Sequence, residues 1–199
     1  ENDFIPPQIE NNTVTPSGKQ LCEDKVLLLI KCITNLRGFN IVGPDISVPY
    51  NHMGATIIDA ILQAGTTWKT VVKPRIQKIM NYQDAETTTG FLQLMKKEGI
   101  VLLNWSDDEK PSRIRNVASF FKDNGIETEA NLKTWLEDDK NAARLKKLRG
   151  IGNKTTDYFK ILAGISTSAV DRHLINFIKE AGIKVGINEY FEAQKIINK

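Results

Sequence analysis

The sequence contains one glycine-rich stretch, Leu148-Arg149-Gly150-Ile151-Gly152-Asn153-Lys154-Thr155, between two segments of helical character. Apolar residues recur at helical spacing on both sides of it, which predicts helices over about residues 141–148 and 153–163. Gly150 and Gly152 carry no Cβ and therefore leave the backbone free to turn sharply between these helices. The stretch predicts a helical hairpin over about residues 141–163.

The remainder of the chain repeats its apolar residues with the same period. One helix is expected after Asp171, ending at Gly182, and the others over about residues 23–37, 56–63, 67–80, 87–97, 111–123, 131–137 and 188–197. Pro74 is expected to kink or split its helix, because proline lacks the N–H that a helix interior needs. The apolar runs at 99–103 and 183–187 are too short to build a sheet. The predicted fold class is all-α, with about nine helices in two lobes.

Length and composition indicate a soluble globular protein. The chain has 199 residues, of which 41% are hydrophobic and 26% are charged. Residues 1–20 contain several prolines and no sustained periodicity, so we expect an extended arm ahead of a helical domain over 21–199. No apolar run approaches the roughly 20 residues that span a membrane, and the first residues do not resemble a signal peptide. We expect a monomer in the cytoplasm or nucleoid, without membrane contact.

Metal-ligating residues are scarce, whereas basic residues are concentrated in one place. Zinc and iron-sulfur sites need about four soft ligands at close spacing. Two cysteines and two histidines do not supply them, so no iron-sulfur cluster, metal site or other cofactor is expected, and Cys22 and Cys32 should be free thiols. The net charge is only +3, yet six basic residues fall within 140–154, and no acidic residue lies between Asp139 and Asp157. This local positive charge favours a polyanionic partner.

The turn of the hairpin is predicted to bind an anion. The first N–H groups of the second helix have no partner within the helix, and the positive end of the helix dipole points the same way. A nucleic-acid phosphate held there would be positioned without its bases being read. A plain turn between packed helices would use the same glycines, but the neighbouring basic residues favour DNA.

Lys154 and Asp171 are the candidate catalytic residues. Lys154 falls in the first turn of its helix, where the dipole and partial burial would favour the neutral amine, which is a nucleophile. Asp171 follows 17 residues later at the start of another helix, where the dipole favours a carboxylate. A solvated lysine and an aspartate that caps a helix would produce the same pattern.

The glycine-rich stretch, followed by Ala169-Val170-Asp171-Arg172-His173, resembles the signature of the helix-hairpin-helix (HhH-GPD) superfamily of base-excision DNA glycosylases. Members similar to endonuclease III and to the archaeal-type 8-oxoguanine glycosylases combine the hairpin, a lysine at the start of its second helix and a downstream aspartate. Residues 61–67 fall where such enzymes carry a helix and loop that approach the lesion, and residues 112–121 resemble a further family helix. The likeness spans about residues 56–199.

The resemblance implies a two-lobed helical fold with a cleft that binds double-stranded DNA containing a damaged base or an abasic site. Lys154 would attack the sugar C1′ and form a Schiff base, which makes the enzyme a DNA glycosylase with AP lyase activity. Asp171 would accept a proton or stabilise positive charge on the sugar. A monovalent cation on the hairpin carbonyls is also typical of the family. The expected DNA contacts are Gln63, in the gap left by the flipped nucleotide, with Lys147, Arg149, Gly150, Ile151, Gly152, Asn153, Thr155 and Arg172.

Some features depart from the family and leave alternatives open. Arg149 stands where many relatives carry proline, and the cysteine-rich loop of the endonuclease III branch is absent, so the damaged base is undecided. A monofunctional glycosylase in which Asp171 activates water is one alternative. A non-catalytic helix-hairpin-helix DNA-binding protein and a helical protein-interaction domain are the others. The three tryptophans, Trp68, Trp105 and Trp135, are widely spaced, and each is expected in the core rather than as a base-stacking platform.

Overall fold

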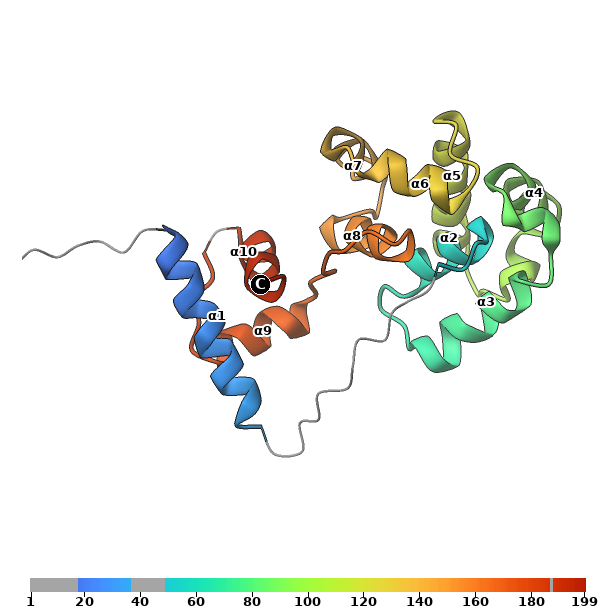
Figure 1. Cartoon of the computed structure of the whole chain (residues 1–199). Coiled ribbons are helices and arrows are strands. Elements are labelled where there is room, and N and C mark those ends of the chain that lie inside the picture. Colours follow the sequence, from blue (N-terminus) through green and yellow to red (C-terminus); the bar gives the residue numbers. More distant parts are fainter. Residues whose placement is uncertain (1–17, 37–48, 187) are drawn as a thin grey trace, which may run out of the picture.

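The computed structural model describes residues 18–36, 49–186 and 188–199, and within these ranges it contains helices and no strands (Figure 1). A π-helical turn, η1 (Trp68–Val72), precedes α3, and a 3-10 turn, η2 (Gln83–Glu86), precedes α4. The all-α prediction is confirmed for the described residues. Their α-helices are α1 (Gly18–Thr34), α2 (Met53–Leu62), α3 (Lys73–Ile79), α4 (Thr88–Leu103), α5 (Glu109–Asp123), α6 (Glu129–Leu136), α7 (Asp139–Leu145), α8 (Asn153–Leu162), α9 (Arg172–Glu180) and α10 (Glu189–Ile197).

Helix α2 forms the centre of the larger hydrophobic core. All of its residues are buried, and it packs against α3, α5 and α8. Its sequence is apolar almost all round, which is the pattern of a helix enclosed by other helices. Ile57, Ile58 and Ile61 are at most 1% exposed, and burying each of them stabilises the fold by about 1.5–3 kcal/mol. This helix is therefore a firm support for the loop that follows it.

A second, smaller core is formed by α1, α9 and α10. Figure 1 shows these three helices on one side of the molecule and α2 to α8 on the other. The chain passes from the larger group to the smaller one between the end of α8 and the start of α9. The buried apolar residues of the smaller core are Leu29, Val170, Ile178, Ile183, Ala193 and Ile196.

The hairpin consists of α7, a glycine turn and α8. Gly150 has φ of +81°, in the left-handed region that favours glycine. A Cβ at this position would also lie 2.4 Å from Cζ of Arg113, so the guanidinium group fills the space that a side chain would need. Ile151 is 4% exposed and anchors the turn in the larger core, and its N–H donates to the Leu148 carbonyl at 3.1 Å. The turn is therefore held in place by packing as well as by backbone geometry.

Three element boundaries differ from those expected. Helix α1 begins at Gly18, so residues 18–20 are helical and do not belong to an extended arm, whereas residues 1–17 lie outside the described residues. Pro74 lies in the first turn of α3, where its missing N–H removes no helical hydrogen bond, and the preceding residues form η1. Residues 99–103 continue α4 beyond a kink at Gly99, where φ is +52°.

Candidate active site

Lys154 and Asp171 meet between the two groups of helices. Lys154 is the second residue of α8, which packs in the larger core, and Asp171 is the N-cap of α9 in the smaller one. The Nζ of Lys154 lies 3.3 Å from Oδ2 of Asp171. The two side chains are 43% and 32% exposed, so both groups are open to solvent. The fold therefore brings together the two residues that the sequence singled out.

The surroundings of Asp171 keep its carboxyl group ionised. Oδ1 accepts a hydrogen bond from the backbone N–H of Leu174 at 3.0 Å, and Oδ2 faces the Lys154 amine. The Leu174 hydrogen bond, aided by Lys154, holds the pKa of Asp171 below its usual value, although partial burial acts in the opposite direction. Asp171 is therefore a fixed negative charge at neutral pH.

The pair lies in the wall of an open pocket of about 1040 Å³. Residues 63–68, which follow α2 and begin η1, line one part of this pocket, and the first two turns of α9 line another. Tyr190 of α10 contributes to the same lining. The volume lies slightly above the range of about 300–1,000 Å³ that is usual for sites that enclose drug-sized ligands. The pocket is therefore large enough for chemistry on a substrate held beside Lys154.

Several predicted DNA-contact residues lie around this pocket. Gln63 is the C-cap of α2 and lines the pocket together with Lys154. Arg172 is exposed and lines the part formed by α9. Thr155 borders a small adjoining hollow that also involves Gln63 and Lys154. These residues lie where a bound substrate could reach them.

The hairpin residues form a second group beside the first. Lys147, Arg149, Gly150 and Gly152 are exposed. Within the described part of the chain, the N–H groups of the two glycines have no hydrogen-bond partner. Ile151 differs from its neighbours, because its side chain is buried and its N–H is already bonded to Leu148. The exposed hairpin residues therefore leave backbone donors and positive charge at the surface.

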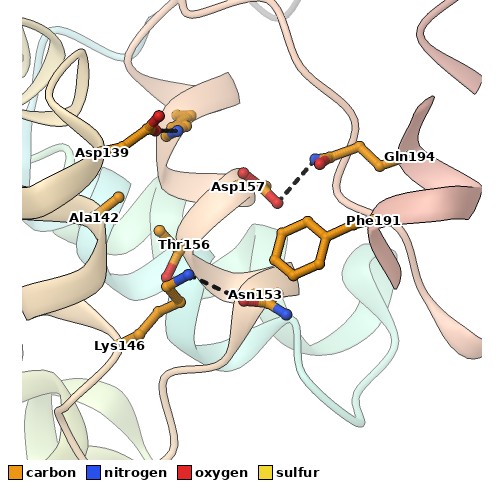
Figure 2. A pocket seen from close by; sticks show the side chains of 9 residues that line it. Asp139, Ala142, Lys146, Asn153, Thr156, Asp157, Phe191 and Gln194 are labelled. Atoms are coloured by element: carbon orange, nitrogen blue, oxygen red, sulfur yellow. Dashed lines mark hydrogen bonds and ion pairs between the residues drawn. The ribbon is translucent and has the colours of Figure 1, made fainter. Parts of the chain in front are cut away.

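Asn153 faces away from the Lys154 pocket. Its Oδ1 accepts a hydrogen bond from Nζ of Lys146 at 3.2 Å, and both residues line a separate pocket of about 330 Å³ between α7, α8 and α10. Figure 2 shows this pocket, with the ring of Phe191 beside Asn153 and Asp157 directed toward Gln194. The side chain of Asn153 is therefore engaged in a different pocket from that of Lys154.

The sequence did not predict a cluster formed by the buried Asp59 with Tyr50 and Tyr158, which lies beside the site. Asp59 in α2 is 1% exposed, and its Oδ2 accepts hydrogen bonds from Tyr50 at 2.8 Å and from Tyr158 at 3.1 Å. Burial raises the pKa of Asp59, and burial together with the nearby carboxylate raises the pKa of both tyrosines. An aspartate inside the apolar run of residues 57–62 is the signal that the sequence offered.

The expectation that all three tryptophans lie in the core is wrong for Trp68. Its side chain is 39% exposed and lines the same pocket as Lys154 and Asp171. Trp105 and Trp135 are partly buried and pack against the larger core, with arginine groups over their rings. The difference arises because Trp68 begins η1 at the edge of the pocket.

The structure also bears on the expectations for membrane helices, cysteines and metal ligands. None of the helices among the described residues is long and apolar enough to cross a membrane. Cys22 and Cys32 are free, as predicted. In residues 18–36, 49–186 and 188–199, no group of three or more His, Cys, Asp or Glu side chains is placed to share a metal ion. The monovalent cation at the hairpin stays a prediction.

Comparisons of this chain with protein-family models, with curated proteins and with solved structures find no match. The function of the chain is therefore inferred from the residues and geometry of the site itself.

Proposed function

We propose that this protein is a base-excision DNA glycosylase with associated AP lyase activity and with the two-lobed fold of the HhH-GPD superfamily. The observation that supports it best is the Lys154 amine 3.3 Å from the Asp171 carboxylate in the wall of a large open pocket. A nucleophile beside a charged partner at a pocket is the arrangement that covalent catalysis needs.

The exposed side of the hairpin would hold the DNA backbone. The free N–H groups of Gly150 and Gly152 can donate to phosphate oxygens, and Lys147 and Arg149 add positive charge beside them. Such contacts position a duplex without reading its sequence. They suit an enzyme that must examine many positions for damage.

The target nucleotide would leave the duplex and enter the pocket beside Lys154. Extruding a nucleotide costs a few kcal/mol, and the cost is lowest for a damaged or mispaired base. Gln63 lies on the pocket wall at the end of the rigid helix α2, and it would occupy the gap left in the duplex. Selection of damage would therefore begin before any bond is broken.

In the proposed reaction Lys154 first loses a proton to solvent, to which its side chain is 43% exposed. The lone pair of the amine forms a bond to C1′, and the electrons of the glycosidic bond leave with the base, which takes up a proton. One proton of the substituted amine passes to O4′ as the C1′–O4′ bond breaks, which opens the sugar ring and gives the Schiff base. Solvent then removes a proton from C2′, the C2′–H electrons expel the 3′ phosphate, and water hydrolyses the Schiff base and frees Lys154.

Asp171 would act mainly as a fixed negative charge. Because its pKa lies below the usual aspartate value, its carboxylate is a weak base. It is better suited to stabilise the positive charge that develops on the sugar than to accept the amine proton. The hydrogen bond from Leu174 would keep this charge aimed at the reacting centre.

Borohydride trapping on a duplex with one abasic site tests this proposal. Borohydride reduces the Schiff base to a stable amine, so the wild-type chain should form a covalent adduct with the DNA. We expect Lys154→Ala to form no adduct.

A wild-type chain that binds the duplex in a salt-sensitive manner but forms no adduct would overturn the lysine mechanism. The ion pair between Lys154 and Asp171 makes a monofunctional glycosylase the second candidate, because a paired amine need not attack. Release of a damaged base without an adduct would favour that candidate. Binding without base release would favour a non-catalytic DNA-binding protein.

A further inference from the structure

Trp68 is an exposed aromatic side chain in a pocket that also contains the proposed nucleophile. Its indole is 39% exposed, and it shares the lining of the pocket with Lys154 and Asp171. We propose that Trp68 is the platform on which the extruded base stacks. This inference rests on the proposed function, because it assigns the surface that receives the base.

The backbone presents Trp68 at the edge of the pocket. Trp68 is the first residue of the π-helical turn η1, and the preceding Thr67 is extended. Single π-helical turns are rare and occur frequently at functional sites. The wide turn lies directly after the loop at residues 63–67, which lines the same pocket. Trp68 therefore lies between the buried helix α2 and the open pocket that Lys154 also lines.

Two charged side chains, Lys73 and Asp59, lie next to the indole of Trp68 and favour one position of the ring. The ammonium of Lys73 lies 5.7 Å from the centre of the ring. Burial raises the pKa of Asp59, and the indole N–H of Trp68 is one of the groups that offset part of that rise, while Oδ1 of Asp59 is buried without an ordinary hydrogen-bond partner. An indole has only this one donor, so the carboxylate favours a single orientation of the ring. The ring is thus oriented by charge on two sides.

The same cluster connects Trp68 to the nucleophile. Tyr158, which donates to Asp59 at 3.1 Å, lies one turn after Lys154 in α8. Asp59 therefore links the helix that carries Lys154 to the side chain that would receive the base. This arrangement would fix the position of Trp68 relative to Lys154. A platform without such a link would let the two sites move independently.

Stacking explains why a tryptophan would serve here. Every base has a π-face, so an aromatic platform accepts different bases and is worth about 1–3 kcal/mol per base. Hydrogen bonds to the edge of the base would add the discrimination. Trp68 should therefore strengthen the binding of a nucleotide that has a base and leave the binding of an abasic nucleotide almost unchanged.

The experiment measures affinity in the Lys154→Ala background, which lacks the proposed nucleophile. The probes are duplexes that contain one 8-oxoguanine, thymine glycol or uracil, and one that contains tetrahydrofuran, which has no base. We expect Trp68→Ala to lower the affinity ratio of the best base-bearing duplex to the tetrahydrofuran duplex about tenfold, and Trp68→Phe to lower it less. Phe191→Ala is the matched control, since Phe191 is 45% exposed but lines the other pocket.

A ratio that stays the same on Trp68→Ala for every duplex in the panel overturns the platform. An equal loss of affinity for the tetrahydrofuran duplex also overturns it, because that duplex has no base to stack. Thermal unfolding of each variant excludes a simple loss of fold. Abasic-site trapping by the wild-type chain is scored separately. If the chain traps no abasic site but its affinity ratio depends on Trp68, the proposed lyase activity is overturned and the role of Trp68 as the platform is supported.

Discussion

Helix α8 borders two pockets, and the two parts of its surface that face these pockets carry similar chemical groups with different outcomes. On one face, Oδ2 of Asp157 accepts hydrogen bonds from Tyr190 and, at 2.9 Å, from Gln194, so α8 is joined to α10 (Figure 2). On the other face, Lys154 and Asp171 join α8 to α9 through one contact of 3.3 Å in a much larger pocket. Both contacts bridge the two cores.

The difference lies in how fully each carboxylate is used. The partners of Asp157 are themselves anchored, because Gln194 also donates to the Ser168 carbonyl at 2.8 Å and to Thr167 at 3.2 Å. Such a network is rigid and leaves little capacity for a ligand. The Lys154 pair is solvent-exposed and has few other bonds, so a substrate can replace part of it. The first face is therefore structural, and the second is the place to look for chemistry.

Replacing the lysine at each of the two pockets should give the largest difference between them in the yield of the borohydride adduct. Lys154→Ala removes the only proposed nucleophile, so we expect complete loss of the borohydride adduct. Lys160→Ala, at the smaller pocket, removes an ion pair with Asp139 at 3.4 Å, and it should leave the adduct yield within about twofold because surface pairs contribute little. Equal yields from the two variants would contradict the assignment of the faces.

Replacing the carboxylate at the open face should slow the reaction while preserving the fold. In Asp171→Asn the charge is lost but asparagine remains a good N-cap for α9. We expect trapping to slow about a hundredfold, which is typical for loss of one electrostatic stabiliser in a transition state. Asp171→Ala should slow it similarly and also cost about 1 kcal/mol of stability through loss of the cap. A trapping rate unchanged in Asp171→Asn would remove Asp171 from the mechanism.

The carboxylate at the closed face should behave in the opposite way. Asp157→Ala leaves the half-buried Tyr190 hydroxyl without its acceptor, whereas Gln194 keeps its bonds to Ser168 and Thr167, and a loss of this kind costs about 1 kcal/mol. We expect urea unfolding to show this loss, with trapping per folded molecule almost unchanged. A large loss of trapping with no loss of stability would reverse the distinction between the faces.

The dependence of stability on pH is the smallest of the four effects. Since the pKa of Asp171 is lowered in the folded chain, its stabilising contribution is present above the ordinary aspartate pKa and is lost as the pH falls through the folded value. Asp59, whose pKa is raised, has the opposite sign: it stabilises when protonated, and this contribution is lost as the pH rises.

Urea unfolding at pH 3 and pH 6 measures both contributions. The deficit of Asp171→Asn relative to the wild type should be larger at pH 6. Asp59→Asn should gain stability relative to the wild type on going from pH 3 to pH 6. A pH-independent difference in both variants would show that neither carboxyl group is coupled to folding.

Much of the local structure could be predicted from the residues alone. The helical period indicated an all-α chain, and Gly150 and Gly152 indicated the hairpin. Lys154 and Asp171 were chosen as a pair, and they are in contact. Trp68 was assigned to the core because tryptophan is usually buried, but its position in η1 exposes it. The role of Asp59 was missed because the apolar run around it does not indicate which polar side chains will contact the carboxylate in the folded chain.

The order of the amino acids determined the helices and the turn, because periodicity and the absence of a Cβ act within a few residues. The tertiary structure decided which side chains share a pocket. Asn153 and Lys154 are neighbours in the sequence, yet one binds Lys146 in the small pocket and the other meets Asp171 in the large one. Adjacent residues of a helix point about 100° apart, so only the packing of α7, α9 and α10 around α8 determines what each one faces.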